Sequence, residues 1–114
     1  MPWSTYKMFA PPTLPTDPDV SIRETDNDAA HARLSAVRKG YLEDPFIQYF
    51  VPRPHLVPTR PPLINIGTYL RSQAVDNLVK GWLNLDLRGG KKQIVSLGAG
   101  SDTRFWRLVV SSLG

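Results

Sequence analysis

KKQIVSLGAGSDTRFWRL, residues 91–108, is the stretch that decides the expected fold. Gln93 to Leu97 form a short, mostly apolar run that is typical of a buried strand, and the glycine turn Gly98-Ala99-Gly100 follows it. Asp102 and Thr103 come next, and both residue types start helices by accepting backbone N–H groups. Strand, glycine turn and helix in this order predict the first unit of a doubly wound α/β fold, where the turn lies against a nucleotide-like cofactor.

The residues before this stretch predict helices separated by one extended connection. Capping residues followed by a helical apolar period predict a helix over about 28–39, which Gly40 ends. Asp44-Pro45 predicts the start of a short helix, because Asp can cap it and Pro suits the first helical position. Five prolines within residues 52–62 predict an extended connection. The apolar period then resumes and predicts a helix over residues 63–83.

The glycine turn also discriminates between cofactors. A dinucleotide fingerprint reads G-x-G-x-x-G, and Thr103 stands where the third glycine would be. The turn therefore argues against a pyrophosphate and favours a smaller adenosine-containing ligand such as S-adenosylmethionine. Taken alone, Gly98-Ala99-Gly100 fits contact with a cofactor and a purely structural bend equally well.

Composition narrows the class of protein. Fourteen basic and ten acidic residues give a net charge of +4, but the cations are scattered, so we expect no nucleic-acid partner. No apolar run approaches the roughly 18 residues of a membrane span, and the first residues do not form a secretory signal. We therefore expect a cytoplasmic monomer without a membrane partner. The chain has no cysteine, and its two histidines lack partners at ligand spacing, so we expect no metal site.

One string identifies a family: LGAGSDTRFWRL, residues 97–108, resembles the leucine carboxyl methyltransferases. Residues 39–51 and 60–71 look like the amino-terminal helical cover of the same family, in the same order. The sequence of these segments resembles fungal members most. The resemblance runs from near Ala30 to Leu108. It implies S-adenosylmethionine-dependent methylation of the C-terminal leucine on the catalytic subunit of the type 2A serine/threonine phosphatase.

The resemblance also implies the residues of the cofactor site. Gly98 and Gly100 match the turn that runs beside the cofactor, and Arg33 and Arg71 match basic positions near its methionine carboxylate. An arginine on an amphipathic helix is otherwise often just solvated, which is the competing interpretation of Arg33. No catalytic residue is implied, because a peptide carboxylate is ionised near neutral pH and attacks the methyl carbon directly. Asp102 is interpreted as the cap of the following helix rather than as a ligand contact.

Three regions are expected along the chain. Residues 1–25 form a disordered Pro-rich arm, since five of the eleven prolines lie in residues 1–19. Residues 26–90 form a helical cover. Residues 91–114 start a Rossmann-like, S-adenosylmethionine-binding methyltransferase sheet with its first strand and glycine turn. Because a parallel strand needs neighbours that would follow residue 114, we expect a truncated α/β fold and an inactive isolated chain.

Two other functions stay open. One is the related carboxyl methyltransferase that acts in wybutosine synthesis on transfer RNA, which shares the glycine turn and the basic helix. The other is a non-catalytic remnant, whose helices from Ala29 to Trp82 bind the phosphatase without methylating it. The tripeptide sequence Asp44-Pro45-Phe46 favours the phosphatase methyltransferase over the transfer-RNA enzyme.

Overall fold

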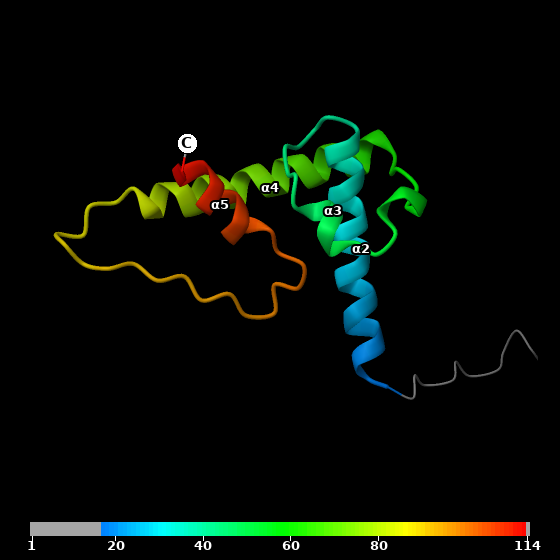
Figure 1. Cartoon of the computed structure of the whole chain (residues 1–114), viewed down its shortest axis with the longest axis horizontal. Helices are drawn as coiled ribbons and strands as arrows, with labels where there is room; N and C mark the ends of the chain where they lie inside the picture. Colours follow the sequence, from blue (N-terminus) through cyan, green and yellow to red (C-terminus); the bar gives the residue numbers. More distant parts are fainter. Residues whose placement is uncertain (1–16, 114) are drawn as a thin grey trace, which may run out of the picture.

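The computed structural model describes residues 17–113, and every regular element within them is a helix (Figure 1). The elements are α2 (Asp19–Arg38), α3 (Ile47–Phe50), the 3-10 turn η1 (Pro54–Leu56), α4 (Pro62–Leu83) and α5 (Arg104–Leu113). In Figure 1 the long helices α2 and α4 cross, and α5 lies alongside α4. None of the helices within these residues is both long and apolar enough to cross a membrane.

The expected α/β fold is wrong for the residues described. Residues 93–97, predicted to be the first strand of a Rossmann-like sheet, have no regular structure, and no strand occurs anywhere in 17–113. Between α4 and α5 the chain loops away from the helices, in yellow and orange in Figure 1. The apolar side chains of Ile94, Val95 and Leu97 are all exposed. A strand forms only with a neighbour that pairs with its backbone N–H and C=O groups, and residues 17–113 contain no such neighbour for this segment.

Helix α2 begins earlier than its sequence pattern predicts. It starts at Asp19 instead of near residue 28, because the Asp17 carboxylate accepts the backbone N–H of Asp19 at 2.9 Å and pairs with Arg23 at 2.7 Å. Residues 19–25, expected in the disordered arm, are therefore helical. The rest of that arm, residues 1–16, lies outside the residues that the structure describes.

The predicted end of α2 at Gly40 is confirmed. Gly40 has a φ of +83°, a conformation that favours glycine, and its N–H donates to the Val37 carbonyl at 3.1 Å. The N–H of Tyr41 donates to the carbonyl of Ala36 at 2.8 Å. These two bonds satisfy the last carbonyls of the helix in a Schellman motif, so the chain turns sharply toward Asp44.

A small core holds α2 against its neighbours. Ala30 and Leu34 of α2 pack with Ile47 and Val51, at and just after α3, and Val37 and Val57 cover this cluster. A polar contact joins α2 to α4 beside it: the buried Ser35 hydroxyl donates to the Asn65 side-chain oxygen at 2.8 Å. Burial of apolar area together with satisfied polar groups therefore fixes the crossing of α2 and α4.

Helix α4 confirms the prediction for residues 63–83, since it runs without interruption from Pro62 to Leu83. Its first residue is proline, which suits a position whose N–H has no partner within the helix. The short helix α3 follows Asp44-Pro45 as predicted, but it begins at Ile47, so Pro45 is not its first helical residue. The Asp44 carboxylate accepts the Phe46 N–H at 3.1 Å just before the helix. Helices α2 and α4 carry the two predicted arginines, Arg33 and Arg71.

Candidate functional site

A cleft of about 590 Å³ opens between α2, α4 and the glycine turn. Its walls carry Arg33 from α2, Arg71 and Ser72 from α4, and Ala99 and Ser101 from the turn. Three segments that are far apart in the sequence therefore meet there. The structure brings the two predicted arginines to one cleft with the turn that contains Gly98 and Gly100.

Arg71 is exposed to the cleft and makes no hydrogen bond or ion pair with any residue that the structure describes. The other two arginines of the cleft both have carboxylate partners: Arg33 pairs with Asp44, and Arg104 pairs with Asp102. Arg71 is thus the cleft arginine whose charge is not offset within residues 17–113. The planar guanidinium of Arg71 suits a planar or tetrahedral oxyanion of a ligand, such as a carboxylate or a phosphate.

Arg33 is not the solvated surface arginine of the competing interpretation. Only 17 % of its side chain is exposed. Its Nε donates to Asp44 Oδ2 at 2.5 Å, and its Nη1 donates to the Ser72 hydroxyl at 3.0 Å. Ser72 follows Arg71 in α4. The contacts with Asp44 and Ser72 therefore hold the Arg33 guanidinium in the wall of the cleft, where α2 faces α4.

The glycine turn is held by a carboxylate that the sequence pattern did not single out. Asp26 of α2 accepts the Ser101 N–H on Oδ1 at 2.7 Å and the Ser101 hydroxyl on Oδ2 at 2.8 Å. Gly98 and Gly100 have φ values of +64° and +60°. A Cβ on Gly100 would overlap the Asp26 carboxylate, with Cγ only 2.8 Å away. Close approach to α2 therefore requires glycine at position 100.

The role of Asp26 was not predicted from the sequence, because the residues adjacent to it resemble the start of a helix. Thr25 to Asp28 contain the residue types that cap helices, whereas in the structure they lie inside α2. The contact between Asp26 and Ser101 spans 75 residues of sequence. A local pattern carries no information about such a pairing.

Asp102 caps α5, as predicted. Its Oδ1 accepts the backbone N–H of Arg104 at 3.0 Å, and its Oδ2 accepts a hydrogen bond from the Arg104 guanidinium at 3.0 Å. Thr103 follows the turn directly and is buried. The cap and this buried threonine connect the glycine turn rigidly to α5.

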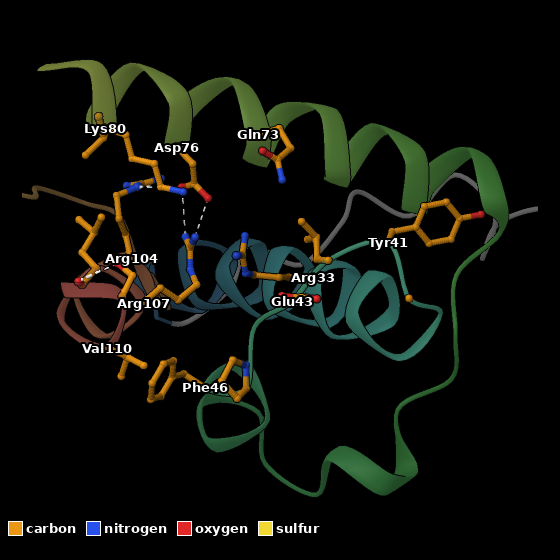
Figure 2. Close-up of a pocket in the computed structure, with 16 residues that line it drawn as sticks. Arg33, Tyr41, Glu43, Phe46, Gln73, Asp76, Lys80, Arg104, Arg107 and Val110 are labelled. Atoms are coloured by element: carbon orange, nitrogen blue, oxygen red, sulfur yellow. Dashed lines mark hydrogen bonds and ion pairs between the residues drawn. The ribbon is translucent and has the colours of Figure 1, made fainter. Parts of the chain in front are cut away.

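A second cavity of about 550 Å³ lies between α4, α5 and the loop that follows α2 (Figure 2). Arg107 Nη1 donates to Asp76 Oδ2 at 2.5 Å, and Arg104 Nε donates to Asp76 Oδ1 at 3.5 Å. Figure 2 shows both guanidinium groups turned toward the Asp76 carboxylate. This ion-pair cluster attaches α5 to α4, and its charges are largely offset within the cluster.

The Asp76 cluster predicts an acid-sensitive attachment of α5. Burial raises the pKa of Asp76, but hydrogen bonds and positive charge from Arg107, with the charge of Arg104, outweigh it and hold the pKa below its ordinary value of 3.8. A lowered pKa in the folded state stabilises the fold above the unfolded-state pKa, and this stabilisation is lost as the pH falls through the folded-state pKa. We expect hydrogen exchange of the α5 amides to accelerate relative to the α2 amides as the pH falls below about 4.

Asp76→Asn should remove that extra acid sensitivity and leave α5 equally exchangeable, relative to α2, at pH 5 and pH 2. Asp86→Asn, an exposed carboxylate after α4, is the matched control and should keep the behaviour of the unsubstituted chain. The same pH dependence in Asp76→Asn and the unsubstituted chain would contradict the assignment.

Comparison with known proteins identifies the family. A family model described as leucine carboxyl methyltransferase matches residues 21–112. The protein named leucine carboxyl methyltransferase 1 from Aspergillus fumigatus is 53 % identical over 93 residues, which cover 82 % of this chain and 23 % of that relative. The protein of the same name from Schizosaccharomyces pombe is 44 % identical over 90 residues, covering 79 % and 28 %. No solved structure matches the chain.

A plant relative, the leucine carboxyl methyltransferase 1 homolog of Arabidopsis thaliana, is 40 % identical over 89 residues, covering 78 % of this chain and 26 % of that protein. The chain therefore spans about a quarter of the length of the curated relatives it matches. The matched region includes nearly all of α2 and α5 and the whole of α3, α4 and the glycine turn. Since the family model covers well over half of its residues, the chain belongs to the leucine carboxyl methyltransferase family.

Proposed function

We propose that these residues supply the amino-terminal wall of the cofactor site in an S-adenosylmethionine-dependent methyltransferase. The proposed substrate is the C-terminal leucine carboxylate on the catalytic subunit of phosphatase 2A. The observation that carries the proposal is the cleft that Arg71, Arg33 and the glycine turn line together, in which Arg71 has no ion-pair partner among residues 17–113. The family supports methyl transfer to a leucine carboxyl group.

The residues of the cleft fit the methionine portion of this donor. That portion carries a carboxylate, for which Arg71 offers a guanidinium that has no partner within residues 17–113, while Arg33, held by Asp44 and Ser72, lines the same cleft. Gly98 and Gly100 have no side chains, so a ligand can approach the backbone of the turn closely at these two positions, whereas Ala99 and Ser101 are the turn residues that line the cleft. The cleft volume of about 590 Å³ lies within the usual range for small-molecule sites, about 300–1,000 Å³.

The reaction needs orientation more than proton transfer. When bound, the donor supplies an electrophilic methyl group on sulfur. A leucine carboxylate is already ionised near neutral pH, so the chain need not provide a general base. Arg71 would hold the donor by its carboxylate, and Arg33 would limit its rotation. Rate then comes from alignment of the two reactants and from exclusion of water.

Methyl transfer by the full-length protein that carries these residues tests the proposal. S-adenosylmethionine with a labelled methyl group is incubated with purified phosphatase 2A catalytic subunit, and with the same subunit lacking its C-terminal leucine. We expect label on the first substrate only. The isolated 114-residue chain should transfer none, because it spans about a quarter of its relatives. Equal labelling of both substrates, or labelling of transfer RNA instead, would contradict the proposed substrate.

A further inference from the structure

We propose that Asp44 is a positioning residue of this site, which sets Arg33 and the glycine turn at the separation that the methyl donor requires. The inference rests on the proposed function. Asp44 does not line the cleft itself, so it acts through residues that do. Its role therefore differs from that of Arg71, which faces the ligand.

The Asp44 carboxylate is the meeting point of three segments. Its side chain is fully buried. Oδ2 accepts hydrogen bonds from Arg33 Nε at 2.5 Å and from the Thr103 hydroxyl at 2.6 Å, and Oδ1 accepts the Phe46 N–H at 3.1 Å. Arg107 Nε lies 3.9 Å from the same Oδ2. One carboxylate thereby joins α2, the start of α3 and the end of the glycine turn.

Charge explains why this arrangement is specific to an aspartate. A buried carboxylate is tolerated only when cations and hydrogen-bond donors replace its water, and Arg33, Arg107 and Thr103 supply both. The Arg107 charge is shared with Asp76, so Arg33 is the main counter-ion of Asp44. Without the Asp44 charge, the partly buried Arg33 would lose its anion and would turn toward other acceptors or water.

The geometry of the cleft depends on the same oxygen. Arg33 stands on one wall, and Thr103 ends the turn that forms the other. Both bind Asp44 Oδ2, so the position of this atom sets the distance between the two walls. Ser72 fixes the far side of the Arg33 guanidinium at 3.0 Å, which leaves Arg33 one orientation when Asp44 is in place.

Asp44→Asn in the full-length protein tests the inference. Asparagine keeps the size of the side chain and the oxygen that accepts the Phe46 N–H, but removes the negative charge. We expect the KM for S-adenosylmethionine to rise about tenfold while kcat changes less than threefold, because the reacting groups are not touched. The neighbouring Glu43→Gln removes an exposed charge and is the matched control, with both constants unchanged.

A double-mutant cycle separates positioning from general destabilisation. If Asp44 acts through Arg33, Asp44→Asn should raise the KM little further in an Arg33→Gln background. A loss of stability alone would add in both backgrounds. If Asp44→Asn does not fold, Thr103→Val removes one of the donors to Oδ2 and should raise the KM about threefold, without lowering kcat.

The two proposals fail in different ways. An unsubstituted protein that transfers no methyl group contradicts the proposed function. An active protein whose KM is unchanged by Asp44→Asn, or by Thr103→Val where the first variant is unfolded, overturns only the inference about Asp44. Full additivity of Asp44→Asn and Arg33→Gln also overturns it.

Discussion

Arg71→Ala is expected to weaken S-adenosylmethionine binding to the full-length protein by about 30- to 100-fold. The Arg71 guanidinium has no partner among the described residues, so its interaction with a ligand carboxylate does not have to displace an internal ion pair. Loss of a charge-assisted, paired hydrogen bond costs about 2–2.7 kcal/mol, which corresponds to this change in affinity.

Isothermal titration with S-adenosylmethionine measures the effect of Arg71→Ala. Arg71→Lys should recover part of the affinity, because it keeps the charge but not the planar pair of donors. Arg23→Ala is the control, since Arg23 lies near the start of α2 and pairs there with the exposed Asp17, outside the cleft. An affinity within threefold of the unsubstituted protein would remove Arg71 from the site.

Gly100→Ala is expected to lower the affinity for S-adenosylmethionine by about 30-fold and to destabilise the fold. Its φ of +60° is unfavourable for alanine, by roughly 1–2 kcal/mol. The added Cβ would also overlap the Asp26 carboxylate, which holds the turn through Ser101. The turn must therefore shift away from α2, and the cleft opens.

Two control variants separate the causes of the Gly100→Ala effect. Gly89 has a φ of +80° and open space around its Cβ position, so Gly89→Ala should cost stability without changing affinity. Asp26→Ala relieves the overlap, so Gly100→Ala should lower stability less in that background. Urea unfolding and titration with S-adenosylmethionine measure both quantities. An unchanged affinity in Gly100→Ala would show that the turn does not contact the donor.

The end of α2, the extent of α4 and the start of α5 could be predicted from local patterns because the forces that set them are local. Gly40 ends α2 through its own φ and two nearby hydrogen bonds, and Asp102 caps α5 through a residue two positions away. The apolar period of α4 predicted its extent for the same reason. Residues 93–97 show the limit of such patterns, because a strand depends on a partner that periodicity does not reveal.

The site was predicted in part. The resemblance named Arg33, Arg71, Gly98 and Gly100, and the cleft brings the two arginines to the turn that contains the two glycines. From its position before Pro45, Asp44 was predicted to cap a short helix. That prediction accounts only for the hydrogen bond that Asp44 accepts from the Phe46 N–H. Its bonds to Arg33 and Thr103 span 11 and 59 residues, beyond the reach of any local pattern.

By itself the sequence determined where α4 lies, where α2 ends and α5 begins, and which family the motifs resemble, because capping, φ preference and apolar period act within a few residues. Only the tertiary structure decided that residues 93–97 stay unpaired, that Asp26 holds the glycine turn, and that Asp44 joins both walls of the cleft. Each of those outcomes depends on which distant groups meet once α2 and α4 have packed together.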